Sequence, residues 1–508
     1  MPSSLKARIK NRAIWESSTI KVLGVIEMIL GISLLAPAVI ALFYGEDPWI
    51  FVYPVPFLLI LGTLQYVLFK NVEIVKPASG LMMMFAAWWV AFFVSSIPFF
   101  LHGASFVDSL FEGVSGFTTT GMSAIEDSSL PYSMLFWRSI TQWAGGIAVV
   151  MIFLFLIPMM GIGGKAFVNN ELTGSETYKF SMRIKSAARN FVSIYVLLSV
   201  AEAVLLMICG VGSFESITTM LSTISTGGFV AGGDGVAGYS FAAQVVVLAF
   251  MFLGGTNFYL HYRALNKREF SAYRKSQEFI WTVIWFLLAT VAITAILLIS
   301  ADDLFAVDIG NTIWHTLFTV VSMGTTTGYV ITDTIVWPLA AVMIMWMVML
   351  FGSMSGSTSG GVKIYRFLIL RSYVKNGIYK MFHPYSVRDV RVDSRSVSSD
   401  AVVSAVVVIT MFLVALIIST IFLLVSETGM SISESIGLSI SAISNVGIDM
   451  GGTAIHGLSS ASKVFLSFMM WVGRLEVVIA LLLFTKTFWR DLISDTNTGV
   501  RQTKKRRI

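Results

Sequence analysis

The sequence predicts an all-α polytopic membrane protein with four pseudo-symmetric repeats, each a span, a pore helix and a second span, around a central pore. Two further spans precede the repeats. Two observations carry this prediction. Of 508 residues, 56% are hydrophobic and 13% are charged, which is roughly half the charged fraction of an average soluble domain. In addition, a Thr/Gly-rich stretch recurs four times between apolar segments.

Apolar runs of 18 or more residues indicate transmembrane helices, and a soluble protein could bury one such run but not ten. The first run is longer than the apolar part of a signal peptide, and no small-residue cleavage site follows it, so we expect it to be retained. The lone Cys209 argues against a disulfide framework and a cysteine metal site. The ten runs cover about residues 18–44, 49–69, 80–102, 133–160, 190–211, 240–262, 278–300, 335–371 (interrupted), 399–425 and 459–486.

Basic residues are confined to alternate connections between these runs. The positive-inside rule therefore predicts a multi-pass protein of the cytoplasmic membrane with both termini in the cytoplasm. The C-terminal RQTKKRRI is interpreted as a stop-transfer or lipid-facing cluster and not as a nucleic-acid tail. The connections without Lys or Arg, which carry acidic residues instead, are about 45–48, 103–132, 212–239, 301–334 and 426–458.

The four Thr/Gly stretches each follow a mildly apolar segment of about 12 residues, too short to span a membrane but long enough for a re-entrant half-helix. They read GFTTTGMS (116–123), TISTGGF (223–229), MGTTTGY (323–329) and ISNVGID (443–449). Aligning Gly121, Gly227, Gly328 and Gly447 gives a repeat of about 100–120 residues. The predicted units are 1–76 for the N-terminal segment and two extra spans, 77–164 (filter 118–123), 165–268 (filter 224–229), 269–397 (filter 325–330, intramembrane loop 352–361) and 398–508 (filter 444–449 and basic tail).

Thr and Gly are poor helix formers, so these stretches expose backbone groups at membrane depth. Such backbone is tolerated only where it is buried in protein or lines a water-filled cavity. Glycine lets successive carbonyl groups turn toward one axis, and rings of carbonyl oxygens replace the hydration shell of a cation. The predicted potassium-binding filter residues are Thr119, Thr120, Gly121, Ser225, Thr226, Gly227, Thr326, Thr327, Gly328, Asn445, Val446 and Gly447.

The stretches, together with WRSITQWAGGI (137–147), GGTNFYLHY (254–262), SGSTSGGVK (355–363) and GRLE (473–476), resemble the Trk/Ktr/HKT superfamily of potassium uptake proteins, above all the TrkH potassium-translocating subunit. The resemblance covers nearly the whole chain. It implies a homodimer with one pore per protomer. Gly121 favours potassium, because some sodium-preferring plant relatives have serine there, while Asn445 and Val446 make the fourth filter the least regular.

The resemblance also implies a cytosolic partner. Outside its spans the chain has only loops of a few dozen residues, so a nucleotide sensor must be a separate chain. The implied partner is a TrkA-like ring of RCK/KTN subunits that binds NAD(H) or an adenine nucleotide and docks on the basic loops, including 363–397. No organic cofactor is expected in this chain itself.

The second span of the third repeat is interrupted by GSMSGSTSGG (352–361). Unwound backbone between two half-spans must face a pore or other protein, and the resemblance implies an intramembrane gate. A passive kink is the alternative. The predicted gate residues are Gly352, Ser353, Ser355, Gly356, Ser357, Thr358, Ser359, Gly360, Gly361 and Lys363.

Arg474 lies inside an apolar run, where a charge is costly and usually faces an interior or water-filled route. By resemblance it lines the pore below the filter as an electrostatic barrier to cations; the alternative is a structural pair with a carboxylate. Glu476, two residues on, points to a different helix face. Glu202 is assigned a structural role between helices, and Arg138 a place as an interfacial anchor.

These observations together predict potassium-selective uptake, gated by the loop and regulated by the separate cytosolic subunit. A sodium or sodium-coupled potassium transporter of the same fold is the alternative, and proton-coupled, sodium-coupled and channel-like flux all stay open. An intramembrane enzyme would need a paired nucleophile and base or a metal cluster within the spans, and we find neither motif. A receptor or scaffold would leave the four filter-like stretches unexplained.

Overall fold

The computed structural model describes residues 19–69, 77–126, 129–156, 177–300, 308–386, 388–393, 395–448, 455–475, 477–486 and 488–490. The predicted basic segments at the N-terminus, around Lys165 and at the C-terminus lie outside these residues. Within the described part, the regular structure is helical except for one antiparallel hairpin, β1 Arg391–Val392 paired with β2 Arg395–Ser396. The all-α class predicted from composition is confirmed.

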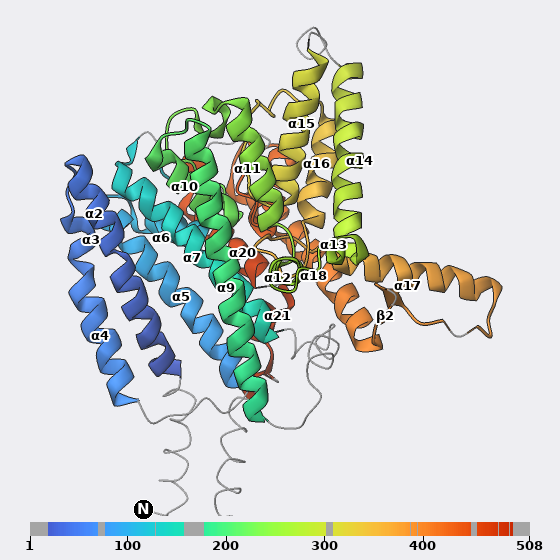
Figure 1. The fold of residues 1–508 in the computed structure, drawn as a ribbon, viewed down its shortest axis with the longest axis horizontal. Helices are drawn as coiled ribbons and strands as arrows, with labels where there is room; N and C mark the ends of the chain where they lie inside the picture. The colour runs from blue at the N-terminus through green and yellow to red at the C-terminus, as the bar shows by residue number, and fades with distance from the viewer. Residues whose placement is uncertain are drawn as a thin grey trace, which may run out of the picture.

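An N-terminal helical pair flanks the rest of the molecule (Figure 1). Its elements are the apolar helix Thr19–Tyr44, which ends in α2 Leu35–Tyr44, then α3 Trp49–Val52 and α4 Pro54–Leu68. Two glycines let the pair pack closely, because a Cβ added at Gly24 or Gly62 would lie closer than 3.0 Å to the carbonyl oxygen of the other. Small residues at such contacts are typical of membrane helices.

Four units with the same element order follow, each a long helix, a short helix and a second helix. The long helices are α5 Pro77–Leu101, α9 Thr177–Ile208, α14 Gln277–Ser300 and α18 Ser399–Ser426; the short helices are α6 Phe106–Phe117, α10 Ser213–Ile224, α15 Ile309–Gly324 and α19 Ile432–Ser444. Each second helix packs against the short helix of the next unit: α7 Tyr132–Leu156 on α10, α11 Phe241–Gly254 on α15, α16 Leu339–Phe351 on α19, and α20 Ser460–Arg474 on α6. This order closes a ring of four units.

Local sequence explains where the short helices begin. Ser105 accepts a hydrogen bond from the Asp108 amide, Asp308 accepts one from the Asn311 amide, and Ser431 forms a capping box with Glu434. Such side chains satisfy amide groups that have no partner in the first helical turn. Three of the four short helices therefore have capped starts.

The second helices are more broken than the sequence predicted. We expected one interruption, in the third unit, yet α11 is followed by α12 Phe258–Asn266 at an angle of 102°, and α20 ends at Arg474 before α21 Val477–Leu482 begins. At the first break, the Asn257 side chain accepts a hydrogen bond from the Tyr259 amide and caps α12. Among the described residues, six helices are long and apolar enough to cross a membrane, or seven if the bent pair counts as one span.

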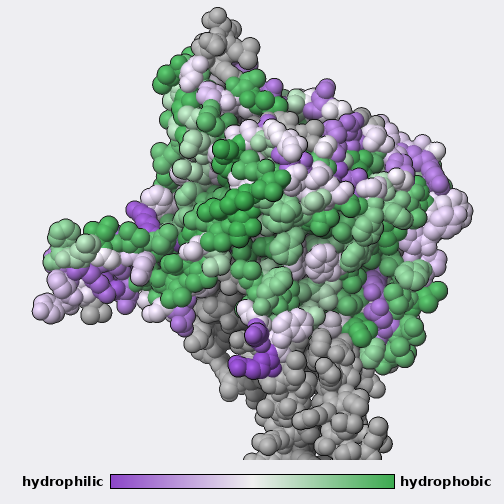
Figure 2. Space-filling view, turned by 180° about the vertical axis from the view of Figure 1, so that it is seen from behind, coloured by the Kyte–Doolittle hydropathy of each residue, from purple (hydrophilic) through white to green (hydrophobic). Residues whose placement is uncertain are grey.

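An arm leaves the helical body between the third and fourth units. It consists of α17 Ile364–Phe382 and the hairpin, and it projects sideways in Figure 1. Seen from behind, the body shows a broad hydrophobic surface, while hydrophilic residues follow the underside of the arm (Figure 2). Asp393 joins the hairpin to the body, since its carboxylate accepts a hydrogen bond from the Gln277 amide at 2.6 Å. The arm thus meets the first turn of α14. Short helices α13 Ser271–Lys275, η2 Gly235–Gly238 and η3 Ile455–Gly457 complete the described elements.

Candidate functional site

The Thr/Gly loops, which follow the four short helices, share one backbone conformation. A residue at the end of each short helix has a positive φ: Thr119 (52°), Thr226 (53°) and Thr326 (58°), each directly after the helix cap, and Asn445 (57°), which is itself the cap. Two residues further on, a glycine also has a positive φ: Gly121 (87°), Gly228 (79°), Gly328 (85°) and Gly447 (89°). Asn tolerates this region better than most residues, so the fourth loop keeps the conformation of the others, although we expected it to be less regular.

These angles correct the alignment of the second loop. The sequence alignment matched Gly227 with the other three glycines, but the matching residue is Gly228. Gly227 instead corresponds to Thr120, Thr327 and Val446. The backbone hydrogen bonds agree, joining Thr120 N to Ser115 O, Gly227 N to Ser222 O, Thr327 N to Ser322 O and Val446 N to Ser441 O at 2.8–2.9 Å. Two adjacent glycines look alike in sequence, and their dihedral angles and hydrogen bonds in the structure distinguish them.

The four loops contact one another in a closed cycle. A Cβ added to the glycine of one loop would lie closer than 3.0 Å to a carbonyl oxygen of the next: Gly121 to Gly227 O, Gly228 to Thr327 O, Gly328 to Val446 O, and Gly447 to Thr120 O. The last contact returns to the first loop, so the ring is complete. Any side chain at these four positions meets both an unfavourable φ and a neighbouring backbone.

The chemistry available in the ring is that of backbone carbonyl and hydroxyl oxygens. Within the described residues, no group of three or more His, Cys, Asp or Glu side chains could hold a metal ion. Helix C-termini carry a partial negative charge, and four short helices end at the ring. Neutral oxygens with this polarity suit a weakly bound monovalent cation. Asp449, the last residue of the fourth predicted filter, lies outside the described residues.

A buried ion pair supports the first loop. Glu112 accepts hydrogen bonds from Ser123 Oγ (2.6 Å) and from the amides of Ala124 (2.8 Å) and Ile125 (3.2 Å). Its other oxygen lies 3.2 Å from Arg138 Nε, and the Arg138 guanidinium stacks 4.1 Å from the centre of the Phe229 ring. Arg138 is only 2% exposed. The prediction that Arg138 is an interfacial anchor is therefore wrong, because Arg138 is buried beside the loop and pairs with Glu112. Glu112 is distant from Arg138 in the sequence, so the pair could not be seen there.

Further polar contacts join one loop to another. Asn445 Nδ2 donates to Thr120 Oγ1 (2.9 Å) and to Met470 O (2.8 Å), which links the fourth loop to the first. The Tyr329 hydroxyl donates to Thr219 O (3.2 Å) in the preceding unit. Glu202 is fully buried on α9, and neither of its carboxylate oxygens has a hydrogen-bond partner among the described residues. The structural role of Glu202 stays a prediction.

The loop between α16 and α17, residues 352–363, lies against the ends of the short helices. Thr358 Oγ1 is 3.0 Å from both Ile224 O and Gly254 O. The Gly360 amide donates to Thr326 Oγ1 at 2.7 Å, and a Cβ added at Gly360 would lie closer than 3.0 Å to Ser444 O. The loop therefore contacts the second, third and fourth Thr/Gly loops or the helix residues just before them.

Contacts at its two ends hold the same loop in place. The Ser355 amide donates to Glu278 Oε1 on α14 at 2.6 Å, and Ser353 Oγ donates to Gly255 O at 2.6 Å. Lys363 Nζ donates to the backbone oxygen and the hydroxyl of Ser359, which closes the loop on itself. All ten predicted gate residues lie in this one segment.

Arg474 ends α20 directly after Gly473, which packs against Ile443 O at the end of α19. It is 7% exposed, and its three guanidinium nitrogens are buried without a hydrogen-bond partner among the described residues. Glu476 lies outside those residues. An isolated buried charge is costly unless water or an ion path accompanies it. The carboxylate pair considered for Arg474 does not occur in the described part of the chain.

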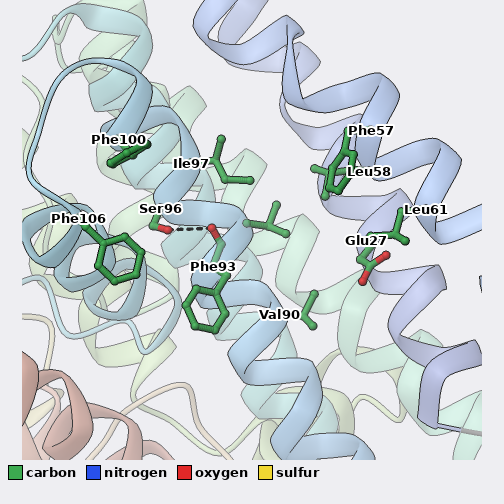
Figure 3. Close-up of a pocket in the computed structure, with 11 residues that line it drawn as sticks. Glu27, Phe57, Leu58, Leu61, Val90, Phe93, Ser96, Ile97, Phe100 and Phe106 are labelled. Atoms are coloured by element: carbon green, nitrogen blue, oxygen red, sulfur yellow. Dashed lines mark hydrogen bonds between the residues drawn. The ribbon is translucent and has the colours of Figure 1, made fainter.

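A separate cavity of about 390 Å³ lies between the N-terminal pair and α5 (Figure 3). Phe57, Phe93, Phe100 and Phe106 line it with other apolar side chains, and Glu27 is at one end. It includes no residue of the Thr/Gly loops. Apolar walls do not replace the hydration shell of a cation as a ring of carbonyl oxygens does.

Comparison with known proteins agrees with this geometry. Residues 54–495 match the TrkH family, described as a cation transport protein. The chain is 28% identical over 480 residues to the Trk system potassium uptake protein TrkG of Escherichia coli K12, covering 92% of this chain and 97% of that protein. It is also 28% identical over 484 residues to TrkH of Halomonas elongata, covering 93% and 98%.

The solved structures agree as well. The crystal structure of the potassium transporter TrkH from Vibrio parahaemolyticus matches with a TM-score of 0.84 and 27% identity, covering 93% of this chain and 99% of that one. The family match spans most of the sequence and includes all four Thr/Gly loops, the loop after α16 and Arg474. The chain therefore belongs to the TrkH family of cation transport proteins.

Proposed function

We propose that this chain is the potassium-translocating subunit of an uptake system in the cytoplasmic membrane, with both termini in the cytoplasm. The observation that carries the proposal is the closed ring of four Thr/Gly loops at the ends of four short helices. The relatives named as Trk system potassium uptake proteins support potassium as the transported ion.

The ring would act as the selectivity filter. K⁺ sheds its hydration shell where backbone carbonyls replace the lost water oxygens, and the four short helices direct their partial negative ends to the same place. The filter residues are those predicted from the sequence, with Gly228 added because it is the counterpart of Gly121, Gly328 and Gly447.

The loop 352–363 would be the gate. It sits beside three of the four Thr/Gly loops and is held by hydrogen bonds to α10, α11 and α14. A bound loop in this place blocks an ion leaving the filter. Opening would therefore require these bonds to break. A passive kink is still the alternative, and it predicts that breaking them leaves basal flux unchanged. Arg474, buried and unpaired within the described residues, would add electrostatic repulsion of cations below the filter.

The arm offers a route by which a cytosolic subunit could act on the gate. A TrkA-like ring that binds NAD(H) or an adenine nucleotide would dock on the basic region 363–397. In that region the Asp393 carboxylate accepts a hydrogen bond from the backbone amide of Gln277. The residue after Gln277 is Glu278, whose carboxylate accepts a hydrogen bond from the backbone amide of Ser355 in the gate. A displaced hairpin would disturb the start of α14 and with it the gate. We further propose that two copies form a homodimer, with one pore in each.

Reversal potentials in liposomes that contain the purified protein test this function. Gradients of K⁺, Na⁺ and pH are imposed separately, with and without the regulatory subunit. We expect the potential to follow the K⁺ gradient. A potential that follows Na⁺ would support the sodium or sodium-coupled alternative, and one that follows pH would show proton coupling.

A further inference from the structure

Gln142 of α7 is fully buried and bonds to the backbone of the second Thr/Gly loop on both sides of Gly228. Its Nε2 donates to Gly227 O at 2.6 Å, and its Oε1 accepts from the Phe229 amide at 3.1 Å. Gly227 O is also the oxygen that contacts Gly121 in the ring. One side chain thus fixes the carbonyl at the contact between the first and second loops.

No other unit has an amide at this position. In three units, a glycine of the second helix packs against a carbonyl in the last turn of a short helix: Gly145 on Phe117 O, Gly254 on Ile224 O and Gly473 on Ile443 O. Three residues before these glycines stand Gln142, Met251 and Met470. In the third unit, Met349 precedes Gly352 by the same spacing. All three methionines are buried, and a thioether has no N–H group to donate.

The loop residue that faces Gln142 is also different from its counterparts. The position is Thr120, Thr327 and Val446 in three loops but Gly227 in the second. A Cβ added at Gly227 would lie closer than 3.0 Å to the Gln142 side chain. The amide therefore occupies the space that a threonine or valine side chain would need. Gly227 itself has no positive φ, so its backbone does not require glycine.

We propose that Gln142 and Gly227 form a matched pair, in which Gln142 is a positioning residue that determines potassium selectivity in this quarter of the ring. The inference rests on the proposed filter. Gly227 and Gly228 are adjacent and lack side chains, so this stretch has more backbone freedom than the other loops. The two hydrogen bonds from Gln142 compensate for that freedom. Without them the Gly227 carbonyl can move inward and coordinate a smaller ion.

A double-mutant cycle tests the pair. The variants are Gln142→Met, Gly227→Thr and the double variant, which recreates the Met and Thr residues found at Met251 and Thr327. We expect Gln142→Met to lower the K⁺/Na⁺ permeability ratio about tenfold, because both hydrogen bonds to the loop are lost and buried hydrogen bonds contribute effects of this size. Gly227→Thr should lower K⁺ flux and the melting temperature because its side chain collides with Gln142. The double variant should recover selectivity to within about twofold of wild type.

Two results would overturn the inference. One is a wild-type permeability ratio in Gln142→Met. The other is a double variant that is no better than the single variants, whether it loses selectivity or fails to fold. Gly228→Ser separates this inference from the proposed filter. If Gly228→Ser keeps wild-type selectivity, the filter assignment fails; if it loses selectivity while Gln142→Met does not, only the role of Gln142 fails.

Discussion

Replacing Thr358 by valine tests whether the loop 352–363 is held shut by the contacts described above. Thr358 is fully buried, and its hydroxyl lies 3.0 Å from Ile224 O and from Gly254 O. Valine has the same shape without the hydroxyl, so the substitution removes these hydrogen bonds and leaves the packing nearly unchanged. The Thr358 amide still donates to Gly254 O, which leaves Ile224 O as the main acceptor that loses its partner.

The loss of a buried hydrogen bond that leaves its acceptor unsatisfied costs about 1 to 3 kcal/mol. If the loop is released when the gate opens, only the closed state bears this cost. The ratio of open to closed protein should then rise by roughly 5- to 150-fold. Basal K⁺ flux, measured in liposomes without the regulatory subunit, should rise by the same factor until most of the protein is open.

A matched control has the same substitution away from the loop. Thr290 on α14 is also buried, and its hydroxyl donates to Phe286 O of the same helix at 2.8 Å. Thr290→Val should leave basal flux near the wild-type value, and Thr358→Ser, which keeps the hydroxyl, should do so too. The reasoning is refuted if Thr358→Val folds normally, as judged by its melting temperature, and its basal flux stays at the level of these controls.

The remaining predictions concern the filter, the gate and Arg474. Gly121→Ser should lower the K⁺/Na⁺ flux ratio, because its Cβ meets Gly227 O and its φ of 87° is unfavourable; unchanged ratios in purified protein would contradict the filter. Deleting several residues of 354–360 should raise basal flux and weaken dependence on the regulatory subunit, and unchanged flux in folded protein would count against the gate. A guanidinium about 6 Å from a cation, at a dielectric near 20, repels it by about 3 kcal/mol, so Arg474→Ala should raise K⁺ flux by up to about a hundredfold with selectivity retained. If that variant instead loses stability and flux together, a structural pairing explains Arg474 better than a barrier does.

Features that depend on local composition follow from the sequence alone. Long apolar runs predict helices in a membrane because lipid offers no hydrogen-bond partner to the backbone. The mildly apolar segments of about 12 residues predicted the short helices, and Thr and Gly located the loops that follow them. The Gly/Ser run 352–361 marked the interruption after α16, because these residues disfavour a continuous helix.

Contacts between residues of different units could not be predicted and were found only in the folded molecule. Gly227 and Gly228 have identical side chains and neighbouring positions, so the match of Gly228 to Gly121 depends on contacts with the other loops. The break after α11 was missed because GGTN lies inside an apolar run, where its capping residue Asn257 gave no clear signal.

Arg138 and Gln142 are four residues apart on one face of α7. Arg138 pairs with Glu112 of the first unit, whereas Gln142 bonds to Gly227 of the second. Such pairs depend on packing between segments far apart in the chain. A single sequence records the residue types at both ends of each contact but not the spatial closeness that joins them.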